Sequence, residues 1–587
     1  MDKKAIIVVA LCGVLLVAWF PLTTRLGWSG RPAPAAVPVS TTSPTAPDAT
    51  GARSEPATPT AAVTAAAAVA PALPVTAPIP LSQPGKLDAL LDPASGGLTG
   101  VTLLTYNEDD RHTPVRLGNA GQPLGVLQPV TAPGAKPAAA WGPVRVLVAG
   151  PERVVLERSL NTTGLSLRQE WRLRPETPYQ FECQITVANR NGAPAAYDPM
   201  WFSAGTISLP AGQAASGGLG MPSDLSAELR LAASGKLQSF APKKIGKLSA
   251  EETAAMAATP VTWLALHTKY FAFILDGGQA GPAGRALDGA RIGESELTVD
   301  QQTQLWLNGG VRLAGGILQP GEEQSRLVRV YAGPKEYKNL QALGDGADSL
   351  LQMDLFFFFN VGWMGWISQQ VLKFMVAIHD YLKTPWAYGL AIIIITFIVK
   401  LLFWPLTHYS TMSMKKMQVL QPQITVIREK YKSDPKHQQE KIMELYRENK
   451  VNPMGGCLPM LLQIPVFFAL FNVFRGAIEL RHSTFLWVTD LAQPDTLPWL
   501  LFGLPIRPLA ILMAATMFLQ QKLTPSAMDP TQAKMMMFMT LFFSFLFYSM
   551  PAGLTLYWTV NQALGIVQML LIHRMIKTHP APLPAKA

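Results

Sequence analysis

Cysteine is scarce in this chain of 587 residues, which has only Cys12, Cys183 and Cys457. The first and the last lie in apolar runs, so Cys183 stands alone in the large polar region. The sequence therefore predicts neither a disulfide framework nor a metal site, and it implies no cofactor. The net charge of +10 does not indicate nucleic-acid binding, because much of it lies in short segments beside apolar runs.

A cleavage motif of small residues is missing where the first apolar run ends. Residues 5–20 follow the sequence Met-Asp-Lys-Lys, and Pro21-Leu-Thr-Thr comes directly after them. A cleaved signal peptide and a retained anchor are the two alternatives for such a segment. Because no small-x-small pattern follows the run, and because Leu11 before Cys12 makes a poor lipobox, we predict a retained signal anchor over residues 1–28.

Charge is almost absent from residues 29–84, which are dominated by Ala, Pro, Thr and Val. Such a segment cannot bury enough apolar surface to fold, and its prolines favour an extended tether. We therefore predict a linker over these residues.

Apolar and polar residues alternate through much of residues 85–350. One face of an extended chain would carry the apolar side chains Phe181, Cys183, Ile185 and Val187. This pattern is typical of half-buried antiparallel strands. Many such runs, separated by Gly, Pro and Asn, predict a large β-sandwich domain that ends in a helix over residues 334–351.

The rest of the chain is typical of a polytopic α-helical membrane protein. Residues 351–383 mix aromatic residues with Ser, Gln, Lys and His, which favours an amphipathic helix lying in the membrane interface. Long apolar runs follow within residues 384–578 and predict a membrane core of helical spans. With the N-terminal anchor, the expected total is six spans. The five core spans are expected at about residues 386–406, 457–477, 505–520, 535–549 and 554–573.

Basic residues set the expected topology. The segment 408–455 holds nine Lys and Arg against five Asp and Glu. Its helical periodicity is interrupted at Ser433-Asp-Pro435, a pattern typical of a helix start, so it predicts a helical hairpin. Since basic loops stay in the cytoplasm, we expect the hairpin and both termini there, and the β domain in the periplasm.

One basic residue, Lys400, interrupts the apolar run from Ala387 to Trp404. A charge inside a membrane span costs roughly 2.5–3.5 kcal/mol and is by default a candidate functional residue. Snorkelling can explain it, because about 21 Å of helix separates it from Trp386 and places it in the cytoplasmic half. The alternative is a hydrated cavity lined by the polar side chains of these apolar segments, which include Thr396, Gln463, Asn561, Gln562 and Gln568.

Four motifs follow Lys400 in order: Val451-Asn-Pro-Met-Gly-Gly-Cys-Leu-Pro459, Gln463-Ile-Pro-Val-Phe-Phe-Ala-Leu-Phe471, Gln520-Gln-Lys-Leu-Thr-Pro525 and Met550-Pro-Ala-Gly-Leu-Thr-Leu-Tyr-Trp558. Together with the basic residue in the first core span and the charged hairpin, they resemble the YidC/Oxa/Alb family of membrane protein insertases. The resemblance is tight over residues 356–575. The large β domain and the N-terminal anchor are similar to those of Gram-negative members.

The resemblance implies five core helices around a polar groove that is open to the cytoplasm and to lipid and closed on the outer side. The family carries an Arg where this chain has Lys400, a departure that keeps the charge but loses bidentate pairing. The expected groove residues are Lys400, Thr396, Gln463, Asn561 and Gln562. Substrate would slide along the apolar faces of two helices, one with residues 535–547 and the other with Ile464, Phe467 and Phe468. Tyr557 and Trp558 are the other expected substrate contacts. The alternative for this Met- and Phe-rich stripe is ordinary lipid-facing surface.

The same resemblance implies a chain that inserts, folds and helps assemble proteins of a bacterial inner membrane, without covalent catalysis. Its expected partners are nascent membrane proteins, Sec translocon components and the lipid bilayer. The ribosome and the signal-recognition receptor are expected to bind the hairpin. The tail at 579–587 is short, so we expect no ribosome anchor there.

Two other classes of function compete with this one. A polytopic transporter would use Lys400 in a midplane site, but no internal repeat is visible across the five core segments. A membrane-anchored carbohydrate enzyme would use the β domain, which resembles a sugar-mutarotase-like sandwich. However, His112 and His267 stand alone there and the carboxylates are scattered, so we expect no acid/base pair.

Overall fold

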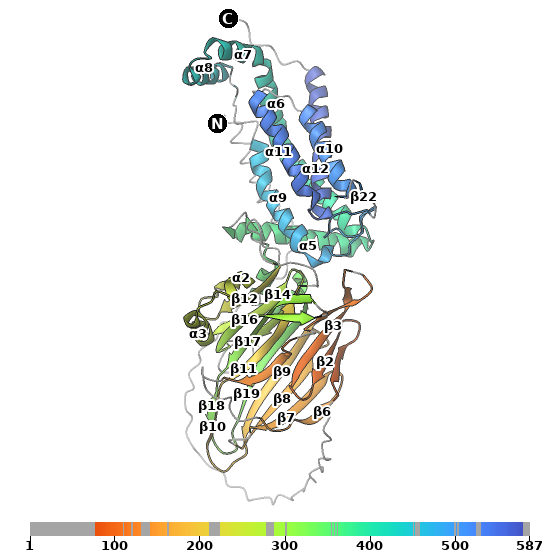
Figure 1. Ribbon diagram of the computed structural model, residues 1–587. Helices are drawn as coiled ribbons and strands as arrows, with labels where there is room; N and C mark the ends of the chain where they lie inside the picture. Colours follow the sequence, from red (N-terminus) through yellow and green to blue (C-terminus); the bar gives the residue numbers. More distant parts are fainter. Residues whose placement is uncertain are drawn as a thin grey trace, which may run out of the picture.

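The computed structural model describes residues 77–109, 111–118, 121–130, 141–160, 164–209, 224–277, 287–299, 302–353, 355–356, 359–360, 362–449, 451, 458–497, 500–501, 504–523 and 530–578. The predicted signal anchor, most of the predicted linker and the tail lie outside these residues. Figure 1 shows a β domain at one end of the described chain and a group of upright helices at the other. Helix α5 (Gly362–Leu382) lies crosswise between the two parts.

Two antiparallel sheets form the β domain, as the alternating pattern predicts. The first sheet has the order β1 (Ile79–Gln83), β2 (Leu87–Asp92), β3 (Gly97–Asn107), β5 (Leu124–Pro129), β11 (Met200–Ser208), β17 (Gln302–Leu313) and β16 (Gly289–Val299), and β4 (Pro114–Leu117) pairs with β3. The second has the order β13 (Leu237–Phe240), β12 (Leu225–Leu231), β14 (Val261–Thr268), β15 (Phe271–Asp276), β19 (Glu323–Pro334), β9 (Gln180–Asn189), β8 (Leu165–Leu173), β7 (Arg153–Leu160) and β6 (Arg145–Ala149). A small sheet pairs β10 (Ala195–Tyr197) with β18 (Gly316–Leu318).

The core of the sandwich is formed by the apolar residues that alternate with polar ones along the strands. The four apolar residues predicted to share one face of β9 are all buried, which confirms that prediction. Opposite them in the register, Trp171 of β8 pairs with Cys183. The Trp171 ring lies 6.1 Å from the Phe202 ring of the other sheet. Gly125, at φ +82°, gives the indole its space, because a Cβ there would lie 2.3 Å from the ring.

Two sequence predictions at the ends of the β domain are wrong in detail. The first strand begins at Ile79, inside the predicted linker, because Ile79 and Leu81 are buried beside β2. The single helix expected over residues 334–351 is two pieces, α4 (Tyr337–Leu343) and a 3₁₀ turn, η1 (Ala347–Leu351). Gly344 and Gly346 lie between the pieces with positive φ, a conformation that no α-helix contains.

Five further helices carry the apolar runs, and two more form the hairpin. Short helices α2 (Pro242–Ile245) and α3 (Ala250–Ala258) complete the β domain. Helix α12 packs against α6 and α10, α10 against α11, and α9 against α5 and α6. The five helices of the apolar runs are α6 (Ala387–Val419), α9 (Leu458–Gly476), α10 (Pro508–Leu523), α11 (Pro530–Tyr548) and α12 (Ala552–Thr578).

The hairpin is shorter than the sequence predicts. Helix α6 continues through Pro405 as far as Val419, so the first predicted hairpin helix is divided between α6 and α7 (Gln421–Lys430). Helix α8 (Pro435–Glu448) begins where the sequence indicates, with the Asp434 carboxylate accepting a hydrogen bond from the His437 N–H at 3.1 Å. Leu420, Ile424 and Ile442 form a small core between the helices.

Two helices in the described chain are long and apolar enough to cross a bilayer, over Ala387–Val419 and Ala552–Ile572. Helices α9 and α11, with 19 residues each, are close to the length of about 20 residues that spans a typical hydrocarbon core, and α10, with 16 residues, is shorter. Short helices fit a locally thinned bilayer.

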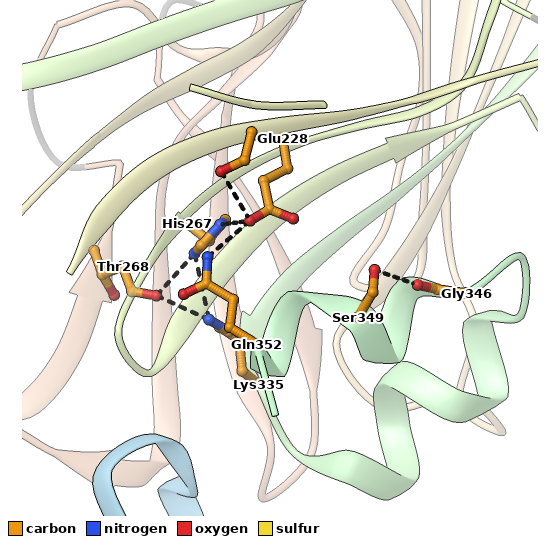
Figure 2. Close-up of polar contacts among 8 residues, drawn as sticks. Glu228, His267, Thr268, Lys335, Gly346, Ser349 and Gln352 are labelled. Carbon is orange, nitrogen blue, oxygen red and sulfur yellow. Dashed lines mark hydrogen bonds and ion pairs between the residues drawn. The ribbon is translucent and has the colours of Figure 1, made fainter. Parts of the chain in front are cut away.

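A buried polar cluster lies where the β domain meets the helices (Figure 2). Lys335 Nζ lies 3.3 Å from His267 Nδ1, and His267 Nε2 lies 3.4 Å from Glu228 Oε1. Gln352, just after η1, donates to the same Glu228 oxygen at 2.8 Å. Burial lowers the pKa of Lys335 to about 8. Burial alone would raise the pKa of Glu228, but hydrogen bonds from His267 and Gln352 and the charge of Lys335 hold it below its ordinary value.

We expect Glu228→Ala to destabilise the β domain by about 3–5 kcal/mol, because it leaves the Lys335 ammonium buried without a counter-charge. Denaturant unfolding followed by tryptophan fluorescence measures the change. Glu251→Ala, in the exposed first turn of α3, is the matched control. Equal unfolding midpoints for the two variants would show that the cluster contributes nothing to stability.

Candidate functional site

Lys400 lies on α6 at a point where three helices meet. Its side chain is half-buried. The Nζ atom lies 3.4 Å from the position that a Cβ of Gly565 in α12 would take. The ammonium therefore lies close to the α12 backbone at this glycine. The charge is therefore turned toward neighbouring helices and not outward from the bundle.

Gln520 of α10 shares this position and was not among the residues predicted for the site. Its Nε2 atom also lies 3.4 Å from the Cβ position of Gly565, so Lys400 and Gln520 approach the same glycine from two helices. The sequence offers one weak signal, a polar residue near the end of an apolar run. Nothing in the sequence shows that side chains of both α6 and α10 reach Gly565.

Helix α12 carries a buried polar stripe. Asn561 and Gln568 are 7% and 2% exposed, and Tyr557 is fully buried. Within the described residues, the Oδ1 atom of Asn561 and both amide atoms of Gln568 have no hydrogen-bond partner. A buried polar group without a partner costs about 1–3 kcal/mol, so this stripe is an unfavourable lining for a dry bundle.

The other predicted groove residues differ in their surroundings. Gln463 of α9 donates a hydrogen bond to the Tyr557 hydroxyl, which joins the predicted residues of α9 and α12. Gln562 is half-buried on the next face of α12. Thr396 is buried, and its hydroxyl donates to the Ile392 carbonyl of its own helix at 2.6 Å. Thr396 therefore uses its one donor locally.

The predicted substrate-contact residues of α9 are packed against other helices. The Phe467 ring lies 5.4 Å from the Trp558 ring of α12 and 6.1 Å from the Phe547 ring of α11. Ile464, Phe468 and Trp558 are half-buried, and Tyr557 is buried. These aromatic residues thus join three helices, and only part of their surface is accessible.

A large exposed apolar surface lies on α11. Its outward side chains are between 41% and 80% exposed, and Phe545 has the highest value. The exposed residues are Met537, Phe538, Met539, Leu541, Phe542 and Phe545. A continuous face of this kind is typical of contact with lipid or with another apolar chain.

No group of His, Cys, Asp or Glu side chains in the described part of the chain could hold a metal ion. His267 and Glu228 lie close together, although the sequence predicted that His267 stands alone. Both are 1% exposed, so a sugar cannot reach them in this arrangement. The chemistry offered by the helical part is a half-buried cation beside buried amides.

The fold and the site define a multi-helix membrane protein with a large β-rich domain. The family description "YidC periplasmic domain" matches residues 84–404, and "60Kd inner membrane protein" matches residues 378–579. The chain therefore belongs to the YidC family of membrane protein insertases.

Two relatives agree with this family. A membrane protein insertase YidC of Syntrophus aciditrophicus is 30% identical over 98% of this chain and 100% of its own length. Another, of Pelobacter propionicus, is 42% identical over 54% of each chain, so the match spans about half the length of that relative. A solved structure described as an active YidC insertase with its first transmembrane domain resolved covers 86% of this chain and 96% of its own, at 20% identity and a TM-score of 0.34.

We expect water to reach the polar stripe of α12. In a chain whose natural cysteines are replaced, Asn561→Cys and Gln568→Cys should react with a water-soluble maleimide at least tenfold faster than Thr559→Cys. Thr559 is a buried residue of the same helix, and its hydroxyl donates to Thr555 at 2.7 Å. Equally slow labelling of all three variants would show a dry, closely packed bundle.

Proposed function

We propose that this chain is an insertase and chaperone that moves segments of nascent proteins into the bacterial inner membrane. One observation carries the proposal: the Lys400 ammonium is turned into an apolar helical bundle, toward α10 and α12. A snorkelling lysine would gain by pointing outward to the headgroups. A lysine directed inward is favoured where water or an anionic group reaches it.

The polar stripe of α12 supplies the rest of the groove. Asn561 and Gln568 place amides on the same helix that meets Lys400 at Gly565. A hydrated, positively charged path through part of the bilayer lowers the cost of moving a polar tail across it, because the tail exchanges bulk water for groove water and fixed dipoles. Acidic tails gain most, since Lys400 attracts them.

The exposed face of α11 would receive the apolar part of the substrate. Its methionines are flexible and polarizable, so they adapt to segments of differing shape. Substrate helices would leave the groove along this face and along the α9 side chains Ile464 and Phe468 into lipid.

We place the hairpin α7–α8 in the cytoplasm and the β domain in the periplasm, with six spans in all and both termini inside. The positive-inside rule supports this orientation. Nascent membrane proteins and lipid are the proposed partners in the core. The Sec translocon would act beside it, and the basic hairpin would contact the ribosome and the signal-recognition receptor. The protein would need no covalent catalysis and no cofactor.

We expect Lys400→Glu to reduce insertion of a single-span substrate with an acidic translocated tail by about tenfold or more, since tenfold requires only about 1.4 kcal/mol. Lys400→Arg should retain insertion, because it keeps the charge. Depletion of the native protein, complementation with each variant, and protease protection of the tail give the measurement.

Lys522→Glu is the matched control, because it makes the same change of charge on an exposed residue at the end of α10. Its insertion should stay within about twofold of the unchanged protein. Wild-type insertion by Lys400→Glu would rule out a role for this charge.

A second expected result concerns the exit path. A photocrosslinking residue at Phe545 should capture the apolar segment of a stalled nascent chain several-fold more often than one at Val567. Both positions are well exposed, but Val567 lies on α12. Equal capture from the two sites would mean that α11 has no special role.

A further inference from the structure

The stretch 477–497, which follows α9, folds into a compact cap. It begins with the 3₁₀ turn η3 (Ile478–Leu480). Phe485 and Val488 then exchange two backbone hydrogen bonds of 2.8 Å. Phe485 is 6% exposed, Val488 2% and Leu491 0%. An irregular segment with this degree of burial has a defined packing role.

This cap closes the ends of three helices that face the β domain. Phe485 packs onto α6 so tightly that a Cβ at Gly389 would lie 2.2 Å from its ring. The N–H groups of Ala552 and Gly553, which begin α12, donate to the Gln493 and Leu491 carbonyls at 2.8 and 2.9 Å. These bonds satisfy donors that a helix start leaves free.

The third helix is held in the same way. The Asp495 carboxylate accepts a hydrogen bond from the Leu509 N–H at the start of α10, at 2.5 Å. The cap therefore joins α6, α10 and α12, the three helices that meet around Lys400. About 16 Å of α6 separates Gly389 from Lys400, so the apolar cap and the cation occupy different depths.

The β domain also contacts residues 477–497. Arg481 donates to the Asn107 carbonyl at 2.6 Å and to the Asp109 carboxylate at 3.1 Å. Its guanidinium also lies 5.7 Å from the rings of both Tyr270 and Phe271. The Arg481 side chain is only 7% exposed.

Two further bonds cross this boundary. Arg111 of the β domain donates to the Thr489 carbonyl at 2.6 Å. The Tyr337 N–H, at the start of α4, donates to the Glu479 carboxylate at 3.2 Å. The cap is thus fixed from both sides, by the helices and by the β domain.

We propose that residues 477–497 are the permeability seal of this protein, that Phe485 on Gly389 is its plug, and that Arg481 lets the β domain hold it closed. The inference rests on the proposed function, because a groove with water needs a barrier at its far end. The seal excludes ions with apolar side chains. The β domain is then part of the barrier.

The test measures proton leak and insertion in the same proteoliposomes, with a pH-sensitive dye inside the vesicles. Phe485→Ala should leak at least fivefold faster than the unchanged protein, while Phe485→Leu, which keeps most of the apolar volume, should stay near the unchanged rate. Leu486→Ala is the matched control, since Leu486 lies in the same turn but is 53% exposed. It should not leak.

Arg481→Ala removes the contacts of Arg481 with the β domain, and it should also raise the proton leak. Its insertion should stay within about twofold of the unchanged protein. Size-exclusion chromatography and thermal unfolding identify the variants that fold. If Phe485→Ala does not fold, the leak rate of Arg481→Ala tests the proposal. Folded variants as tight as the unchanged protein would overturn the proposal. Failure of the proposed function is seen separately, as normal insertion by Lys400→Glu, whatever the leak.

Discussion

A charge held inside an apolar bundle is the constraint on which the helical part of this protein depends. The Lys400 ammonium needs space and polar neighbours. At Gly565 the bundle provides both, because the Gln520 side chain of α10 reaches the same glycine. The Lys400 Nζ atom lies 3.4 Å from the Gly565 Cβ position, which is an ordinary van der Waals distance, so an alanine methyl group would fit there. A small residue at the contact of α6, α10 and α12 is usual for packed membrane helices.

The sequence predicts local structure well where the spacing of apolar residues or a helix-start signal is enough to determine it. The faces of β9 follow directly from alternation, because a shift of one residue would expose Phe181 and Cys183 together. The start of α8 follows from Asp434 before Pro435. The break between α4 and η1 was missed because apolar spacing continues across Gly344, although the backbone there turns to positive φ.

The part of the site that depends on tertiary contacts could not be predicted. Gln520 gains its place only from the crossing of three helices, and no spacing within α10 encodes that crossing. The Glu228–His267–Lys335 cluster is similar, because its members come from β12, from β14 and from the chain just after β19. Each of these residues alone resembles an ordinary polar residue of a strand or turn. These residues differ from ordinary polar residues because they are buried together, and burial is a property of the fold.

The distribution of fixed contacts also limits how the core can change shape. Helix α9 is held near its end by Arg475, which pairs with Asp224 of the β domain at 2.9 Å, and by Asn472, which donates to the Met353 carbonyl at 3.0 Å. The starts of α6, α10 and α12 are held by the cap at the same level. Farther along α12, by contrast, the Oδ1 atom of Asn561 and both amide atoms of Gln568 have no hydrogen-bond partner among the described residues. Under the proposed function, the end of the bundle that the cap does not hold is the end at which a polypeptide would enter.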